Sequence, residues 1–197
     1  LRVGDWFQGK KPHSTTEIDY RRTVMDAAMQ VASGILIVRY RDANGRLSHE
    51  QHIEYKNGLL VSINGIHFNE FGSENSTYVT EFQDGKYDSE GNIISGTILQ
   101  KEYFQGRLTQ QTTYHYEGGA LVNGTLEKPV SSGLLRQEID YRGSKTSSGH
   151  VLVKEFENGK FVRDMDLYYE TGRLLSITEY LANGEKSHTV YKPGAEG

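Results

Sequence analysis

The segment SHEQHIEY (48–55) holds two histidines and two glutamates within a few positions, at His49, Glu50, His52 and Glu54. A metal site needs such side chains to converge on one point. On a strand, Glu50, His52 and Glu54 would share one face and His49 would point to the other. The spacing also differs from the helical HExxH motif of zinc peptidases. We therefore expect a solvated strand face here, with no metal and no cofactor.

Other residue types that could carry out catalysis show no local grouping. The seven histidines are dispersed along the chain, and no GxxxxGK[ST] phosphate loop is present. A glutamate recurs directly before an aromatic residue, at Glu54, Glu81, Glu102, Glu155 and Glu179. A catalytic carboxylate pair occurs once in a protein, so this repetition indicates a structural or surface role. We expect that the protein is not an enzyme; a site in loop insertions is the remaining enzymatic alternative.

Aromatic residues are the best candidates for a binding surface, since the chain has 13 Tyr, 7 Phe and 1 Trp. Such rings bury a large area at low entropic cost and dominate interface energetics. Two interpretations remain open: the rings form a structural ladder along a sheet, or some of them line a groove for a partner. The candidate partner-binding residues are Tyr103, Tyr116, Tyr141, Phe156, Tyr169 and Tyr180.

The net charge of −4 argues against a nucleic-acid partner, because such binders are usually basic. The absence of cysteine excludes disulfides and thiolate metal sites. We expect a protein partner. An anionic lipid is the alternative, because basic residues directly follow several turn glycines, at Arg46, Lys86, Arg107, Lys160 and Arg173. The chain begins at Leu1, and its compartment stays open between cytoplasmic and exported with a leader removed.

The elements that must position these residues are predicted to be strands. From Gly34 onward, polar and apolar residues alternate with period two, and Tyr, Thr, Val and Ile are common. The runs end in glycine turns typical of hairpins, which predicts an all-β antiparallel meander. The segment TVMDAAMQVAS (23–33) is the exception, because its alanines, methionines and flanking Thr23 and Gly34 favour a short N-terminal helix. A strand is the competing interpretation.

A repeated unit underlies these hairpins. It consists of an acidic or polar residue, an aromatic residue, a short polar stretch, a glycine and then an apolar residue. Its copies are RYRDANGRL (39–47), EYKNGLL (54–60), EFQDGKY (81–87), EYFQGRL (102–108), HYEGGAL (115–121), EFENGKF (155–161), YYETGRL (168–174) and EYLANGEK (179–186), with DYRGSK (140–145) as a degenerate member. One hairpin cannot bury its apolar face alone, but stacked neighbours can.

The stretch YYETGRLLSITEYLANGEKSHTVYKPG (168–194) resembles the bacterial variant of the MORN repeat, found in toxin–antitoxin repeat proteins. The resemblance implies an elongated, twisted sheet of successive hairpins with a groove on one face. It also implies a non-catalytic role in protein interaction, antitoxin-like or immunity-like, or in membrane association. The chain departs from the family pattern at Ser187, where a second glycine is usual.

The repeat pattern divides the chain into a non-repeat segment, 1–33, and a repeat domain, 34–197. Within the repeat domain the spacing widens over 61–98 and 122–149, which predicts insertions there. Because the repeated residues build the sheet itself, a function outside the aromatic series is expected where the pattern breaks.

Overall fold

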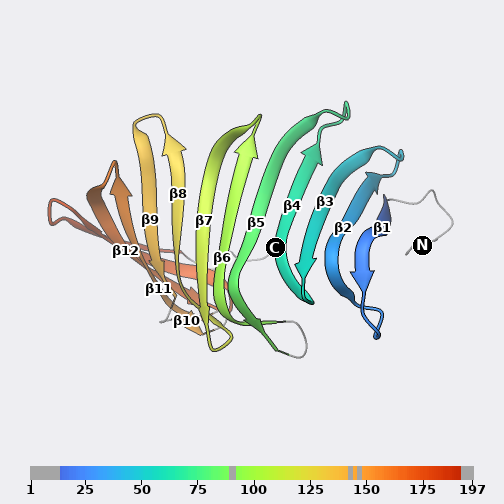
Figure 1. Cartoon of the computed structure of the whole chain (residues 1–197). Helices are drawn as coiled ribbons and strands as arrows, with labels where there is room; N and C mark the ends of the chain where they lie inside the picture. Colours follow the sequence, from blue (N-terminus) through green and yellow to red (C-terminus); the bar gives the residue numbers. More distant parts are fainter. Residues whose placement is uncertain (1–13, 89–91, 142–143, 146–147, 192–197) are drawn as a thin grey trace, which may run out of the picture. The chain divides into compact units, whose positions relative to one another are not determined.

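The computed structural model describes residues 14–88, 92–141, 144–145 and 148–191, all in strands and turns (Figure 1). The prediction of an all-β sheet of successive antiparallel hairpins is confirmed. None of the described residues forms a helix, and so none forms a helix that could cross a membrane.

Strand order in the sheet follows chain order almost throughout, from β1 to β9 and then from β11 to β14, while β10 pairs only with β11. The strands are β1 (Ser14–Met25), β2 (Val31–Asp42), β3 (Leu47–Lys56), β4 (Leu59–Phe68), β5 (Glu74–Tyr87), β6 (Ile93–Phe104), β7 (Arg107–Glu117), β8 (Ala120–Val130), β9 (Gly133–Asp140), β10 (Ser144–Lys145), β11 (Ser148–Glu157), β12 (Lys160–Glu170), β13 (Arg173–Leu181) and β14 (Lys186–Val190).

Residue contacts divide the chain into two compact units. Unit 1 comprises Leu1–Gln83 and Leu99–Thr109, and unit 2 comprises Asp84–Ile98 and Gln110–Gly197. Strands β5, β6 and β7 therefore contribute residues to both units.

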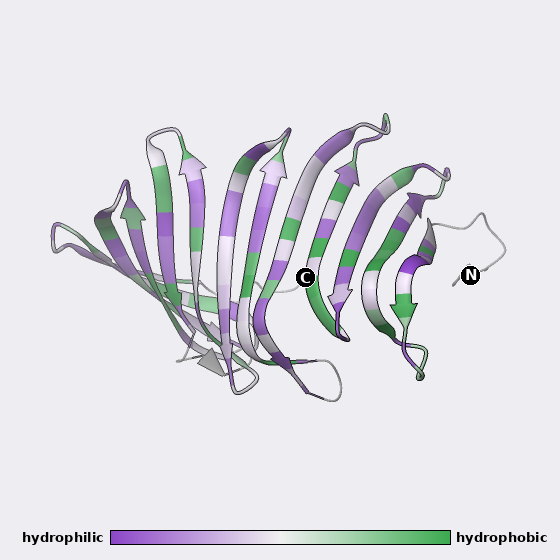
Figure 2. Cartoon of the chain, in the orientation of Figure 1, coloured by the Kyte–Doolittle hydropathy of each residue, from purple (hydrophilic) through white to green (hydrophobic). Residues whose placement is uncertain are grey.

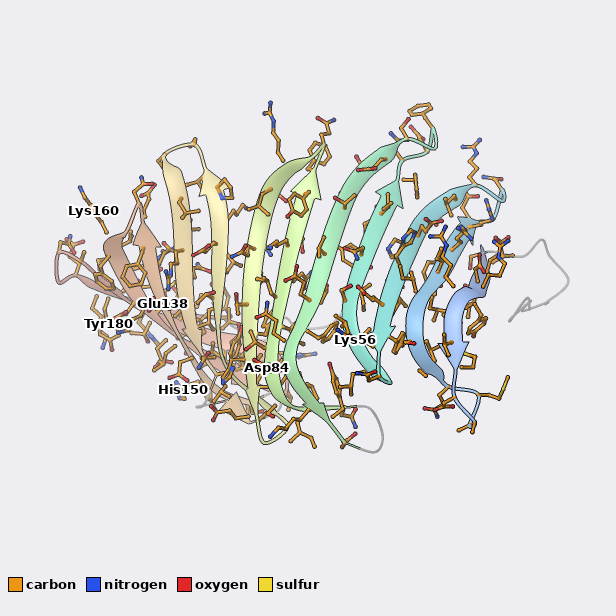
Figure 3. All side chains as sticks on the ribbon, viewed as in Figure 1. Lys56, Asp84, Glu138, His150, Lys160 and Tyr180 are labelled. Carbon is orange, nitrogen blue, oxygen red and sulfur yellow. The ribbon has the colours of Figure 1, made fainter. Side chains whose placement is uncertain are left out.

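Very few side chains are buried in either unit. Among the described residues, the buried hydrophobic side chains are Ile37, Val38 and Val153, and most other apolar side chains keep part of their surface exposed. Polar and apolar residues alternate along many of the strands (Figure 2), and no described helix covers them (Figure 3). Such a sheet is stabilised mainly by cross-strand side-chain pairs, each contributing about 0.2–1 kcal/mol, rather than by a central core.

Tight two-residue turns connect many of the strands. At Asn57–Gly58, Asn158–Gly159 and Thr171–Gly172, both residues have positive φ. This is the type I′ geometry, whose twist matches that of the flanking strands. It explains why the repeat requires a glycine at the second turn position and often places asparagine at the first.

Most hairpins also contain one extra residue in their second strand. In the β11–β12 hairpin, Glu155 pairs with Arg163 and Phe156 pairs with Phe161, so Val162 is unpaired within the hairpin. The carbonyl of Val162 instead accepts a hydrogen bond from Ala182 N–H (3.0 Å), and the carbonyls of Ala32, Val122 and Leu175 accept equivalent hydrogen bonds of 2.6–2.8 Å. In these four hairpins the extra residue is a β-bulge whose carbonyl bonds to a residue just after the next strand. The other such residues are Ala32, Ser48, Val61, Asn75, Val122 and Leu175.

The short helix favoured for 23–33 is wrong, because this segment forms the β1–β2 hairpin. Its turn is closed by Asp26, whose Oδ1 accepts hydrogen bonds from the N–H groups of Ala28 (2.8 Å) and Gln30 (2.9 Å). Asp42 closes the β2–β3 turn in the same way. Met29, with φ 61°, takes the place that Gly45 occupies there. Cross-strand pairing outweighs the high helix propensity of alanine and methionine, as tertiary context often does.

The turn expected at FQDG, in the copy EFQDGKY (81–87), is also absent, since β5 continues through it. Only Asp84 has a positive φ, 52°, whereas the type I′ turns need two consecutive residues in that region. A single left-handed residue bends a strand without reversing it. The change from unit 1 to unit 2 falls at this residue.

Strands occupy part of the predicted non-repeat segment and both of the expected insertions. Residues 14–25 of the non-repeat segment form β1, and residues 1–13 lie outside the described part of the chain. The expected insertions contain strands as well: 61–98 holds most of β4, all of β5 and the start of β6, and 122–149 holds β9 and β10. The proposed division into segments stays a prediction.

Candidate functional site

One face of the unit 2 sheet gathers tyrosine and aliphatic side chains around a pocket of about 640 Å³. We call it the tyrosine face and define it by Tyr114, Tyr116, Tyr141 and Tyr169 together with Leu121, Ile139, Val151, Val153 and Leu167. Ten residues line the pocket and none of them is charged: Gly119, Ala120, Leu121, Ile139, Tyr141, Val151, Val153, Leu167, Tyr169 and Gly172.

Strand register explains why these residues meet. Val153 pairs with Ile139 on β9, and Val151 pairs with Leu167 on β12. Alternate residues of a strand share a face, so Tyr141 lies beside Ile139 and Tyr169 beside Leu167. The bulge in the β7–β8 hairpin then pairs Tyr116 with Leu121 on this same face. Sequence positions far apart are thus brought onto one surface by successive hairpins.

Tyr141 lies at the centre of this cluster. Burial raises the pKa of its phenol, and the neighbouring phenols of Tyr114, Tyr169 and Tyr116 raise it further. Its backbone N–H donates to the carbonyl of Val122, the extra residue of the adjacent hairpin (2.8 Å). The ring is therefore held in place at its backbone and surrounded by three further tyrosines.

A charged network lies on the same face, next to the apolar surface. Glu155 is only 7% exposed, and its Oε2 accepts a hydrogen bond from Gln137 Nε2 (2.8 Å). Arg163 Nε lies 3.1 Å from the other oxygen of Glu155, at an angle too poor for a hydrogen bond, so this contact is an ion pair. Arg163 Nη1 also donates to Glu179 (2.6 Å). The buried carboxylate is thus compensated, and the network forms a polar border to the apolar surface.

Two of the predicted binding residues of unit 2 lie on the opposite face. Phe156 follows Glu155 in the strand and packs edge-on against Phe161, with ring centroids 6.0 Å apart. Tyr180 pairs with Asp164 and is 46% exposed, and Lys186 Nζ lies 5.1 Å from its ring centroid. The structure therefore brings Tyr116, Tyr141 and Tyr169 together and separates Phe156 and Tyr180 from them.

The sixth predicted residue, Tyr103, belongs to unit 1. It contributes to another pocket, of about 460 Å³, to which Tyr78 and Glu102 also belong. Nothing in the spacing of the repeat distinguishes Tyr103 from the tyrosines of unit 2, because the division into units appears only in three dimensions.

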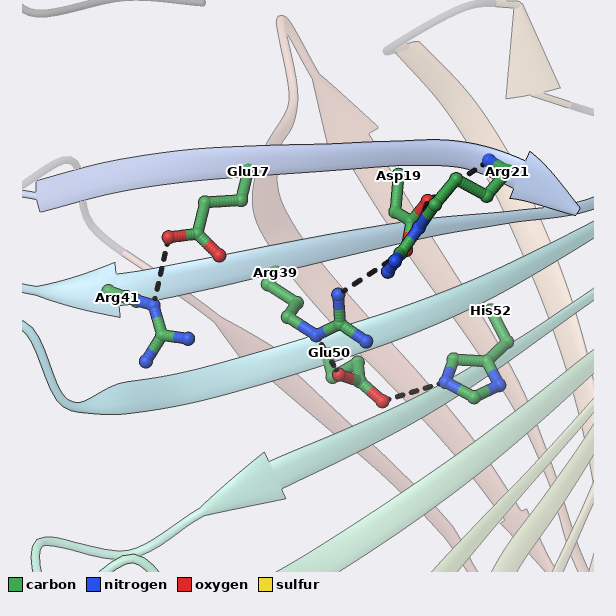
Figure 4. Close-up of polar contacts among 7 residues, drawn as sticks. All are labelled: Glu17, Asp19, Arg21, Arg39, Arg41, Glu50 and His52. Carbon is green, nitrogen blue, oxygen red and sulfur yellow. Dashed lines mark hydrogen bonds and ion pairs between the residues drawn. The ribbon is translucent and has the colours of Figure 1, made fainter. Parts of the chain in front are cut away.

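The segment SHEQHIEY contributes to a ladder of charges across β1, β2 and β3 (Figure 4). Glu50 accepts from Arg39 Nε (2.5 Å) and lies 2.7 Å from His52 Nε2. Burial alone would raise the pKa of Glu50, but the hydrogen bonds with His52 and Arg39 hold it below its ordinary value. Glu54 instead accepts from Ser62 Oγ (3.1 Å). Among the described residues, no group of three or more His, Asp and Glu side chains has a geometry that could hold a metal ion.

The same ladder continues on β1. Arg39 Nη1 lies 3.9 Å from Asp19, and Arg41 Nε lies 3.2 Å from Glu17. Arg21, at the bulge of β1, reaches back to Asp19 along its own strand. Hydrogen bonding by Arg21 keeps the pKa of Asp19 well below its usual range. These charges and the bulge are features that discourage pairing of an edge strand with other chains.

The other face of unit 1 carries an aromatic cluster that sequence reasoning missed. We call it the histidine cluster: Tyr40, His49, His67 and Tyr78, one from each of β2, β3, β4 and β5. The rings of His49 and His67 stack with centroids 4.2 Å apart and an interplanar angle of 11°. Tyr40 stacks on the other side of His49 at 5.3 Å. Burial, and then the neighbouring His67, lower the pKa of His49.

A signal for part of this arrangement was present in the sequence. The period-two pattern already placed His49 on the face opposite Glu50 and His52. It carried no information on register, which is what pairs His49 with His67 and Gly65 with Tyr78. Contacts between neighbouring strands therefore could not be derived from spacing alone.

The chain matches no protein-family model and no curated protein. The assignment of a function therefore depends on the residues and geometry described above.

Proposed function

We propose that the protein is a non-catalytic binding module, and that the tyrosine face of unit 2 binds another protein. The observation that carries this proposal is the pocket of about 640 Å³, which contains Tyr141 and Tyr169 and has no charged residue in its lining. Apolar surface that remains partly exposed on a sheet with few buried side chains is a feature of interaction sites.

The composition of this surface favours a protein partner. Protein interfaces combine an apolar centre rich in tyrosine with a polar border. Here the centre is formed by tyrosine and aliphatic side chains, and the border by the network of Gln137, Glu155, Arg163 and Glu179. Because Arg163 already pairs with two carboxylates, it is not free to attract an anionic membrane surface. We propose that the partner presents apolar or aromatic side chains, and the resemblance to toxin–antitoxin repeat proteins favours a toxin-like protein.

The proposal is tested with three bait proteins in affinity purification from the source cells. Tyr169→Ala removes a ring from the tyrosine face, whereas Tyr180→Ala removes an exposed ring from the opposite face. We expect the wild type and Tyr180→Ala to recover one stoichiometric protein that Tyr169→Ala recovers at least ten-fold less. Truncation of a central interface tyrosine typically costs about 2 kcal/mol or more in binding free energy.

Circular dichroism of each bait establishes that it is folded. Equal loss of the partner with both variants would contradict the assignment to the tyrosine face. Failure to capture any stoichiometric protein, together with salt-sensitive sedimentation on anionic liposomes, would support the lipid alternative instead. A genetic neighbour that is toxic alone and harmless when co-expressed with this chain would support the antitoxin-like role.

A further inference from the structure

The pocket of about 460 Å³ in unit 1 combines aromatic walls with a single carboxylate. Its lining residues include His67, Tyr78, Tyr103 and Phe104 and one acidic residue, Glu102. Glu102 and Phe104 are alternate residues of β6, so their side chains share a face. No lysine or arginine lines it. The pocket is separate from the tyrosine face, which belongs to unit 2.

Glu102 has no cationic partner among the described residues. Its Oε1 accepts a hydrogen bond from Gln100 Nε2 at 3.2 Å, which is a neutral contact. Glu155 occupies the same position in another copy of the repeat and pairs with Arg163. The negative charge of Glu102 is therefore available to a ligand, in contrast to that of Glu155.

Tyr78 is fixed before any ligand binds. Its hydroxyl accepts a hydrogen bond from Gln51 Nε2 (2.6 Å) and lies 3.2 Å from His49 Nε2. Its ring covers Gly65 so closely that a Cβ atom at Gly65 would lie 2.1 Å from the ring atom Cε1. A wall held in this way loses little conformational entropy on binding.

We propose that this pocket binds an organic cation, an alkylammonium group held against the aromatic rings with its charge balanced by Glu102. Aromatic faces attract cations through their quadrupole, and desolvation in a pocket strengthens the attraction. An uncharged ligand would not compensate the carboxylate. An anion would be repelled by it.

Three small probes test the charge requirement. Choline carries a quaternary ammonium, 3,3-dimethylbutan-1-ol is its uncharged isostere, and n-butylammonium represents a lysine side chain. Binding is followed in two-dimensional amide NMR spectra of the whole chain. We expect choline or n-butylammonium to bind about two- to thirty-fold more tightly than the neutral alcohol, with shifts centred on Tyr78, Glu102 and Tyr103. The stronger of the two cations identifies the subclass of ligand.

Two matched variants test the residue assignment. Glu102→Gln preserves the shape of the side chain and removes its charge, so the preference for the cation over the alcohol should disappear. Glu81→Gln makes the same change at an equivalent repeat position outside the pocket lining, and it should keep that preference. The NMR spectra establish whether each variant is folded. Replacement of Phe104 by leucine, which keeps an apolar side chain without the ring, should also reduce the cation preference.

Several results would overturn the proposal: equal binding of choline and its neutral isostere, binding of neither cation, shifts centred outside the pocket, or equal effects of Glu102→Gln and Glu81→Gln. If the spectrum of Glu102→Gln is not that of the folded protein, the wild-type comparison of choline with the alcohol decides the question by itself.

Discussion

The ring of Tyr78 on β5 lies across the backbone of Gly65 on β4, with the two residues directly paired in the sheet. A Cβ atom at Gly65 would lie within 2.1–2.6 Å of the ring atoms and the hydroxyl oxygen of Tyr78. Glycine is therefore required at this position because the neighbouring tyrosine occupies the space of a side chain, and not because of a turn.

Gly65→Ala should destabilise the protein by about 1–3 kcal/mol, because the added methyl group forces the Tyr78 ring off its position and away from Gln51. Urea denaturation of the single variants and of Gly65→Ala combined with Tyr78→Ala measures the coupling between the two sites. In the Tyr78→Ala background the cost of Gly65→Ala should nearly vanish. Additive free energies in this cycle would show that the contact with Tyr78 is not the cause.

Met29→Gly should stabilise the protein by about 0.5–1 kcal/mol. Met29 has φ 61° and its side chain is 75% exposed, so glycine relieves backbone strain without loss of packing. The reciprocal change Gly45→Met, at the matching position of the next turn, should destabilise by a similar amount. Thermal and urea unfolding measure both variants. A loss of stability on Met29→Gly would mean that relief of backbone strain contributes less free energy than the added conformational entropy of the unfolded chain costs.

Asn158→Gly should cost about 1–2 kcal/mol. The Asn158 side chain joins two adjacent turns, as its Oδ1 accepts from Leu134 N–H (2.9 Å) and its Nδ2 donates to the carbonyl of Ser132 (2.7 Å). Glycine retains the positive φ but loses both bonds. Asn57→Gly is the matched control, because Asn57 has the same turn geometry and no side-chain bond to any described residue. Comparable losses from both variants would refute the role of the bridge.

The stability of unit 1 should fall as the pH decreases below about 6.5, the ordinary pKa of histidine. The pKa of His49 is lowered in the folded protein, so the unfolded chain binds a proton that the folded chain does not. Stability then rises with pH across this window, by at most about 1.4 kcal/mol per pH unit for one proton. Urea denaturation at about pH 5 and pH 8 measures the change.

His49→Phe keeps an aromatic ring between Tyr40 and His67 and removes the titrating group. Its unfolding free energy should depend less on pH than that of the wild type. His188→Gln, on the exposed strand β14, should leave the wild-type dependence in place. An unchanged dependence in His49→Phe would assign the titration to another group.

The sequence predicted the hairpins well because glycine turns have a direct local cause. Asn57–Gly58 and Asn158–Gly159 adopt the expected geometry, since both residues must take positive φ whatever their surroundings. The predictions of a helix at 23–33 and of a turn at FQDG were wrong, because pairing with neighbouring strands determines the conformation of both segments. Met29 takes a glycine-like conformation that its residue type does not suggest, and Asp84 takes one without reversing the strand.

The candidate site was predicted only in part, because the face on which a residue lies depends on bulges. Tyr116, Tyr141 and Tyr169 share a surface, whereas Phe156 does not, although all four follow the same sequence rule. The histidine cluster depends on the register between β3, β4 and β5, which spacing along the chain does not determine. Residue type indicated that aromatic residues matter, but only the pairing shows which of them meet.

Successive strands direct their final aromatic residues to opposite faces of the sheet, and this limits which duplications or deletions of strands preserve both faces. The hairpin turns that follow β7 and β12 lie at one end of the unit 2 strands, and Tyr116 and Tyr169 before them point to the tyrosine face. The turn after β11 lies at the other end of the strands, and Phe156 before it points to the opposite face. Duplication or deletion of a single strand would exchange these roles for every residue downstream. Only duplications or deletions of an even number of strands preserve both surfaces. The structural repeat of this protein is therefore a pair of strands and not one copy of the motif.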